Sequence, residues 1–242
     1  MLRYQLQAAG DDRVGIGGNC GLQIADWVPW PAAFRTAHVS SSRVEAEDVS
    51  GNPQSEIPVS WSLRLATEAD VPALEALIPL SVRGLQAAHY SAPQMEAALG
   101  PVFGVDRLLI RDGTYFVAEH HGQVVGCGGW SRRRAVFGGD RHRAGEDGCL
   151  DPAREPARIR AFFVHPNWAR RGIGRCILLA CEKAVRDAGF RSAILVATLS
   201  GEPLYAAFGY TVLERYEVPL GSGLTLPVVR MSKYLDAADG AP

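Results

Sequence analysis

The chain has 242 residues, a formal net charge of −1 and 47% hydrophobic residues, which is ample apolar material for a globular domain. The balanced charge gives no reason to expect nucleic acid or an acidic membrane surface as a partner. No apolar run approaches the roughly 20 residues that span a bilayer. The first residues lead into no apolar signal segment, so we expect a cytoplasmic protein that binds neither nucleic acid nor membrane.

The first 58 residues show neither helical nor strand periodicity. Two linker-like stretches, Ser40–Ser42 and Gly51–Pro53, lie within them. We therefore expect residues 1–58 to form a poorly structured extension, with a small docking segment over Trp27–Phe34 as the alternative. The domain itself is expected at residues 59–236, followed by a flexible tail at 237–242.

The first half of this domain alternates strand and helix signals. A strand is predicted over Ser62–Ala66, followed by Thr67 as the N-cap of an amphipathic helix with Asp70 three residues later. The further predicted elements here are a helix over Ala92–Leu99 and a hairpin of Thr114–Glu119 with Gln123–Trp130. The long polar stretch that follows, residues 131–156, is longer than most connections inside a domain.

The second half continues the alternation. Its predicted elements are a strand over Arg158–Val164, a helix from Ile173 to Ala188, a strand over Ser192–Thr198, a short helix starting at Glu202, and strands over Thr211–Tyr216 and Val228–Lys233. Glycines at 221 and 223 join the last two strands. The order of elements predicts a mixed α/β sheet covered by helices.

The most informative segment lies between the strand that ends at Val164 and the helix that follows it. Gly172 and Gly174 allow close approach of the backbone to a ligand, and the first N–H groups of the helix have no partner of their own. Three arginines, at 170, 171 and 175, surround these glycines. Free amides, the helix dipole and positive charge together predict a site for a phosphate-bearing ligand.

The spacing excludes two common phosphate motifs. A dinucleotide fingerprint would need glycine where Ile177 stands, and no G-x-x-x-x-G-K-[ST] loop occurs in the chain. A nucleotide-binding domain that uses the same two glycines remains an alternative. The six histidines and five cysteines show no metal-ligand spacing, so no metal is expected.

The segment Ala169–Gly174 resembles the coenzyme A pyrophosphate loop of the GNAT-type N-acetyltransferase superfamily, written Q/R-x-x-G-x-G/A. Gly172 and Gly174 match the pattern, whereas Ala169 replaces its first residue. The resemblance extends over residues 61–235. It implies a mixed, mostly antiparallel central sheet flanked by helices, with acetyl-CoA as co-substrate.

The resemblance also implies the site residues. The backbone of the fourth strand would hold the pantetheine arm, and the turn would bind the pyrophosphate: Phe162, Phe163, Val164, Ala169, Arg170, Arg171, Gly172, Ile173, Gly174 and Arg175. Tyr205 would be the general acid, because Leu204–Tyr210 matches the family pattern L-Y-x-x-x-G-[FY]. A tyrosine with a pKa near 10 stays protonated at neutral pH and can protonate a thiolate.

The function expected from this resemblance is transfer of an acetyl group from acetyl-CoA directly to the primary amine of a small molecule. The family's usual glutamate base is missing, since Arg158 and Arg160 occupy the fourth strand; Glu119, Glu155 and His165 are the remaining candidates. The missing base supports one rival function, a non-catalytic module that senses acyl-CoA.

The arginines of 132–134 and 141–143 are expected to form a solvated loop face, with attraction of a substrate carboxylate as the alternative. A homodimer is left open.

Overall fold

The computed structural model of this chain describes residues 61–134 and 148–235. The expected extension at 1–58, the expected tail at 237–242 and the arginines at 141 and 143 lie outside the described residues. No helix in the described ranges is long and apolar enough to span a membrane.

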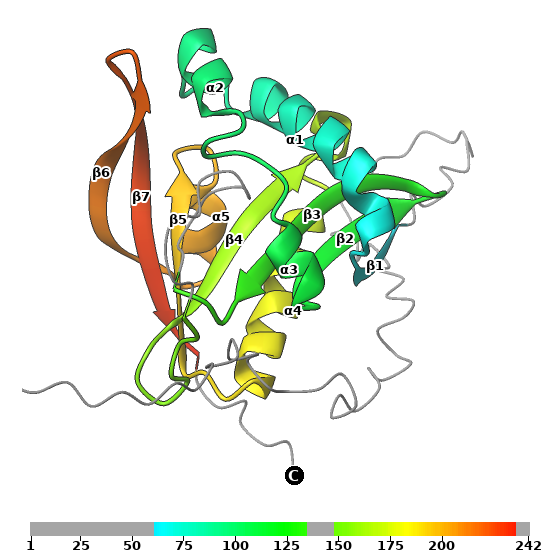
Figure 1. Cartoon of the computed structure of the whole chain (residues 1–242), viewed down its shortest axis with the longest axis vertical. Helices are drawn as coiled ribbons and strands as arrows, with labels where there is room; N and C mark the ends of the chain where they lie inside the picture. The colour runs from blue at the N-terminus through cyan, green and yellow to red at the C-terminus, as the bar shows by residue number, and fades with distance from the viewer. Residues whose placement is uncertain (1–60, 135–147, 236–242) are drawn as a thin grey trace, which may run out of the picture. The chain divides into compact units, whose positions relative to one another are not determined.

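The described part of the chain contains both strands and helices (Figure 1). The strands are β1 (Ser62–Leu65), β2 (Tyr115–His120), β3 (Gln123–Ser131), β4 (Ala157–Val164), β5 (Ser192–Thr198), β6 (Thr211–Gly221) and β7 (Leu224–Tyr234). The helices are α1 (Val71–Leu85), α2 (Ala92–Ala98), α3 (Arg107–Arg111), α4 (Ile173–Asp187) and α5 (Glu202–Ala207), with short 3₁₀ turns η3 (Glu68–Asp70) and η5 (Pro166–Trp168).

Within the described ranges, seven strands form one sheet in the order β1-β2-β3-β4-β5-β7-β6. Every neighbouring pair is antiparallel except β4 and β5, which run parallel. The predicted mixed, mostly antiparallel sheet flanked by helices is therefore confirmed.

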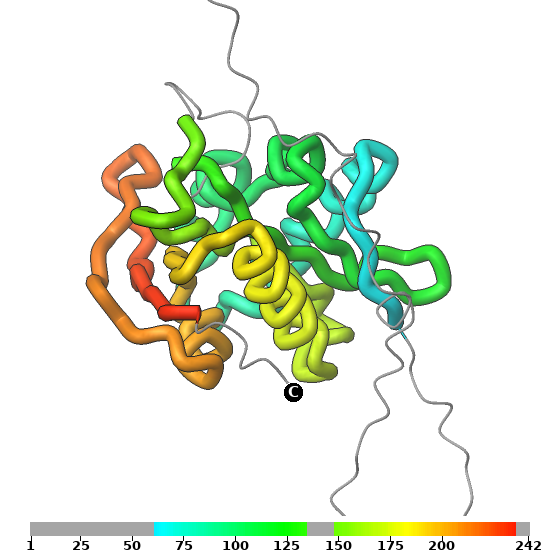
Figure 2. Tube along the Cα trace, turned by 90° about the horizontal axis from the view of Figure 1, so that it is seen from below, coloured from blue at the N-terminus to red at the C-terminus, as the bar shows by residue number. Residues whose placement is uncertain are grey.

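Helices cover both faces of this sheet, and glycines of β3 show which helix lies on which face. A Cβ at Gly126 or Gly128 would meet side chains of α4, whereas a Cβ at Gly129 would meet Leu109 of α3. Figures 1 and 2 agree with this arrangement, with α4 (yellow) on the side of the sheet away from α3 and the start of α1.

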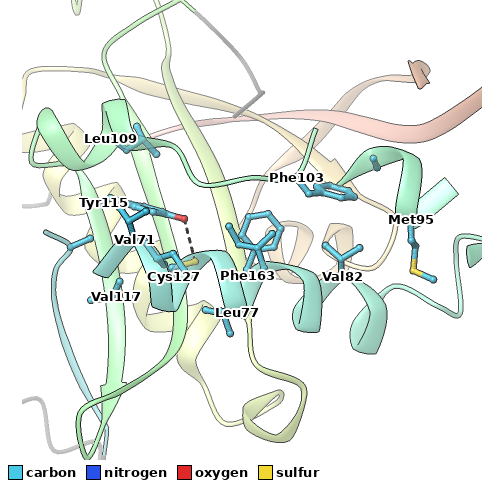
Figure 3. Close-up of a cluster of buried hydrophobic side chains, with 14 of the residues drawn as sticks. Val71, Leu77, Val82, Met95, Phe103, Leu109, Tyr115, Val117, Cys127 and Phe163 are labelled. Atoms are coloured by element: carbon cyan, nitrogen blue, oxygen red, sulfur yellow. Dashed lines mark hydrogen bonds between the residues drawn. The ribbon is translucent and has the colours of Figure 1, made fainter. Parts of the chain in front are cut away.

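The main hydrophobic cluster fills the space between α1, α2, α3 and the sheet (Figure 3). In it the rings of Phe103 and Phe163 meet edge to face, with centroids 6.1 Å apart. The Tyr115 hydroxyl donates to the Cys127 Sγ across a distance of 3.2 Å. The Phe163 side chain is thus part of the core, and only its backbone can serve a ligand.

The last two strands are longer than their predicted ranges. Gly221 pairs with Leu224, so only Ser222 and Gly223 form the turn, and both have positive φ (49° and 75°). Such two-residue turns match the twist of paired strands. Val218 and Leu226 in the added segments are buried in the main cluster, and this burial explains why the pairing continues to the turn.

Candidate active site

The turn between β4 and α4 exposes backbone donors. Gly172, the N-cap of α4, has φ +82°, a left-handed conformation that glycine adopts without strain. The first hydrogen bond of the helix joins the Cys176 N–H to the Gly172 carbonyl at 2.9 Å. The N–H groups of Ile173, Gly174 and Arg175 therefore have no partner within the helix, as expected for an anion site at a helix N-terminus.

The three arginines of this turn have different surroundings. Arg170 and Arg175 line the cavity described below. The guanidinium of Arg171 instead lies over the ring of Trp168, 5.1 Å from its centroid. Two positive charges therefore accompany the free amides, while the third stacks on an aromatic side chain.

The parallel strands β4 and β5 separate halfway along β4. They pair from Ala157 with Ala193 to Ile159 with Leu195, and no pair follows in the described sheet. Ala161 has φ +61°, and the register of β3 against β4 shifts at this bulge. Beyond it, the Val164 N–H donates to the Ser81 Oγ of α1 at 3.1 Å. The bulge and the separation open a gap in the middle of the sheet.

A cavity of about 670 Å³ occupies this gap. Its lining comes from α4 and α5 and also from α1, so it reaches residues on both faces of the sheet. It brings together all of the predicted site residues except Arg171: Phe162, Phe163, Val164, Ala169, Arg170, Gly172, Ile173, Gly174, Arg175 and Tyr205.

The cavity has two ends of different character. We call the turn at residues 169–175 the pyrophosphate end. We call the other the acceptor end; it is lined by Leu85, Gln86, Phe103, Val196, Val218 and Val228. The pyrophosphate end is a single segment of chain, whereas the acceptor end is assembled from α1, the α2–α3 connection, β5, β6 and β7.

Tyr205 lies on α5 and is only 7% exposed. Its ring centroid lies 5.9 Å from that of Phe162 and 5.9 Å from that of Tyr210. Burial raises the pKa of the Tyr205 hydroxyl well above its ordinary value, and the nearby Cys181 adds to this. The hydroxyl therefore stays protonated at neutral pH and can donate a proton into the cavity.

The three candidate bases lie elsewhere. Glu119 accepts from the Arg64 Nε at 2.8 Å, and Glu155 is bound by Arg134. The His165 Nδ1 accepts from the Asn167 N–H and so caps η5. None of the three lines the cavity.

The described arginines at 132, 133 and 134 also lie outside the cavity. Arg133 binds both carboxylate oxygens of Asp112, at 2.7 and 2.8 Å, and Arg134 is bound to Glu155. The guanidinium of Arg132 lies 5.9 Å from the ring centroid of Trp130. Within the described part of this stretch, the arginines thus bind neighbouring protein groups.

The structure adds polar residues that sequence reasoning missed. Asp106 caps α3 and forms a buried ion pair with Arg160 at 3.0 Å, with side chains only 3% and 5% exposed. Both line the cavity, as do Ser81 of α1 and Gln86, the C-cap of α1. A signal existed for two of them: Asp106 precedes a short apolar run as an N-cap does, and Ser81 interrupts the apolar stripe of α1.

Comparisons with known proteins agree with this geometry. The sequence model of the acetyltransferase (GNAT) domain matches residues 111–212. No curated protein sequence matches the chain.

Three solved structures share the fold at low sequence identity. A GCN5-related N-acetyltransferase from Rhodopseudomonas palustris is 22% identical with a TM-score of 0.54, covering 72% of this chain and 95% of that one. A PaiA N-acetyltransferase from Thermoplasma acidophilum, solved with coenzyme A, is 16% identical with a TM-score of 0.50 over 72% and 99%. An N-acetyltransferase from Staphylococcus aureus Mu50 is also 16% identical, with a TM-score of 0.50 over 73% and 99%.

The family match begins at the end of α3 and ends at the start of β6. It therefore includes β4, β5, the turn at residues 169–175 and Tyr205. The predicted resemblance is confirmed: residues 111–212 match the acetyltransferase (GNAT) domain, and the fold is that of a known N-acetyltransferase.

Proposed function

We propose that this protein transfers the acetyl group of acetyl-CoA directly to a primary amine of a small molecule. One observation carries the proposal: a single cavity joins the free amides of the α4 N-terminus, the half of β4 that does not pair with β5, and Tyr205. Its acceptor end provides separate space for a second substrate beyond the gap in the sheet.

The residues present fit coenzyme A. The amides of Ile173, Gly174 and Arg175 would bind the pyrophosphate, with the charges of Arg170 and Arg175 beside them. A Cβ at Gly174 would approach Leu204 to 3.2 Å, so glycine keeps the backbone close to α5. When bound, the coenzyme supplies the acetyl thioester. The backbone of Phe162 lies along the gap, where its polar groups could bind the pantetheine arm or a carbonyl, whereas the Val164 N–H is bound to the Ser81 Oγ.

Acyl transfer from a thioester also needs a proton donor for the departing thiolate. Tyr205 fits this role because it lines the cavity and its raised pKa keeps it protonated. Its ring contact with Phe162 supports this role, because Phe162 lies in the part of β4 that does not pair with β5.

The attacking amine must be neutral, whereas an alkyl amine with a pKa near 10.4 is neutral in roughly one molecule in two thousand at pH 7. In the described lining the only carboxylate is Asp106, and Arg160 neutralises it. Desolvation in the apolar acceptor end would lower the pKa of the amine and so raise its neutral fraction. We therefore assign this step to the cavity and to water rather than to a dedicated side-chain base.

The test is release of free coenzyme A thiol by the full chain, with acetyl-CoA and a broad panel of amines, with mass spectrometry of the products. An amide formed in step with thiol release is the expected result. Thiol release of equal rate without any amine would mean hydrolysis and would contradict the proposal.

The pairing of Asp106 with Arg160 leaves no free carboxylate base in the described lining. This observation also favours a second candidate function, a module that binds acyl-CoA without turning it over. Such a module would show tight binding of acetyl-CoA and no thiol release with any amine of the panel. The same experiment therefore separates the two functions.

A further inference from the structure

The acceptor end has a composition that restricts its substrate. Its walls are formed by apolar side chains of Leu85, Phe103, Val196, Val218 and Val228. Several of these belong to the main hydrophobic cluster, so they are held in place by the core and not by a mobile loop. An apolar group entering here is removed from water, and this burial favours its binding.

The formal charges around the whole cavity are few. Within the described lining they are Asp106, Arg160, Arg170 and Arg175. Arg170 and Arg175 lie at the end where the phosphates of coenzyme A would bind, and Asp106 and Arg160 neutralise each other. A second charge on the acceptor would thus be buried without a counter-charge, and this is strongly unfavourable.

One polar group of this end is left unsatisfied. Gln86 is 6% exposed and lines the cavity, and its Oε1 has no hydrogen-bond partner in the structure. A buried oxygen without a donor is destabilising, and such groups are uncommon in folded proteins. Rotation of the Gln86 amide toward the cavity would let this oxygen accept from a donor on a bound ligand.

We propose that the acceptor is a primary amine on an apolar, uncharged body whose far end carries one neutral hydrogen-bond donor, which Gln86 accepts. The proposal rests on the proposed acetyl transfer and names the substrate class of the same site. It makes Gln86 a specificity-determining residue.

The experiment compares four amines that differ only at the far end of a six-carbon chain: aminohexanol, hexylamine, hexamethylenediamine and aminohexanoate. The full chain is used with saturating acetyl-CoA, and kcat/KM is measured by thiol release. We expect the two amines with an uncharged far end to exceed the two with a charged far end by about 100-fold, because a buried unpaired charge is so unfavourable. We expect aminohexanol to exceed hexylamine by about 5-fold, the effect of one neutral hydrogen bond.

Two variants of Gln86 sharpen the comparison. Gln86→Leu should abolish the advantage of aminohexanol over hexylamine. Gln86→Glu should raise the kcat/KM of hexamethylenediamine relative to hexylamine by about 10-fold, because it adds a negative charge to the acceptor end. Gln123→Glu is the matched control, since Gln123 is exposed and lies outside the cavity lining. Ratios between substrates of one variant do not depend on how much of that variant is folded.

The outcomes separate the two claims. The substrate class is overturned, and acetyl transfer is left intact, by either of two results. One is that an amine with a charged far end is used as well as those with an uncharged far end. The other is that the substrate ratios are unchanged in both Gln86 variants. Thiol release with none of these four but with a peptide N-terminus also overturns it. Binding of acetyl-CoA without thiol release from any amine overturns the proposed transfer itself.

Discussion

The two ends of the cavity offer different groups for binding under the proposed function. The pyrophosphate end uses backbone amides and two arginines from one continuous turn, Ala169–Arg175. The acceptor end uses side chains from separate elements, and the one ion pair near it, Asp106 with Arg160, has no net charge. The first design suits a constant ligand with negative charge, and the second suits a variable ligand selected by shape and polarity. Changes at the two ends should therefore affect different quantities.

The largest effect is expected from breaking the buried ion pair. Asp106→Asn keeps a side chain that can cap α3 but removes the carboxylate charge that lies 3.0 Å from Arg160, so we expect unfolding to become easier by about 3–5 kcal/mol. Urea unfolding measures this change. The double change Asp106→Asn with Arg160→Met removes both charges and should recover most of the loss. A double variant as unstable as the single one would contradict this explanation.

A change where the two ends meet should affect turnover and spare binding. We expect Tyr205→Phe to lower kcat by about 100-fold, because it removes the proton donor, and to leave the Kd of coenzyme A within about 2-fold. Since burial raises the pKa of Tyr205, the wild-type enzyme should lose no activity through this group as the pH rises to 10. Tyr234→Phe, at an 83% exposed position, is the control. Unchanged turnover in Tyr205→Phe would exclude the general-acid role.

A smaller effect is expected from the backbone of the pyrophosphate end. Gly172→Ala places a Cβ where nothing lies within 4 Å, so its effect comes from the left-handed φ alone. We expect about 1–2 kcal/mol of destabilisation and roughly 10-fold weaker binding of coenzyme A, with the KM for the amine unchanged. Gly172→Asn should lose less, because asparagine tolerates this conformation. Equal losses in both variants would indicate that a side chain blocks the ligand directly.

The smallest effect is expected at an ion pair outside both ends of the cavity, and it serves as a baseline. Arg64 donates to both oxygens of Asp70 at 2.8 and 2.7 Å and holds the pKa of this carboxyl at about 2. Because the folded-state pKa lies below the unfolded value near 3.9, the stabilisation is complete above about pH 5 and is lost as the pH falls toward 2. Solvent around the partly exposed Arg64 reduces it to about 1 kcal/mol.

Denaturant unfolding of the wild type and of Asp70→Asn between pH 2.5 and 7 tests this. The difference between them should be constant above pH 5 and should shrink below pH 4, while coenzyme A binding at pH 7 stays unchanged. The exposed Asp187→Asn is the control. A difference that grows as the pH falls would have the wrong sign.

The sequence predicted the turn before α4 and the order of elements well, and the reason is local. A glycine at the N-cap, free amides at the start of a helix and the capping pair Thr67 and Asp70 depend on residues only a few positions apart. The strand at Ser192–Thr198 was predicted with its bounds, because alternating apolar residues mark it without help from other segments.

The acceptor end could not be predicted in the same way. Asp106 and Arg160 are far apart in the chain, and only the folded sheet brings them together. The bulge at Ala161, which opens the gap, has no glycine or proline to mark it. Gln86 follows α1 as an ordinary polar residue, and its burial depends on how α1 and the strands beyond β5 pack.

The central claim, that the turn at residues 169–175 is a coenzyme A site, is tested most directly by thermal unfolding of the full chain with coenzyme A, acetyl-CoA, ATP and NADH in parallel. A ligand at a hundred times its Kd adds about 2.7 kcal/mol of stability. We predict such a shift with the two coenzyme A species and a smaller shift or none with ATP and NADH. Equal shifts with all four, or none with acetyl-CoA, would contradict the account.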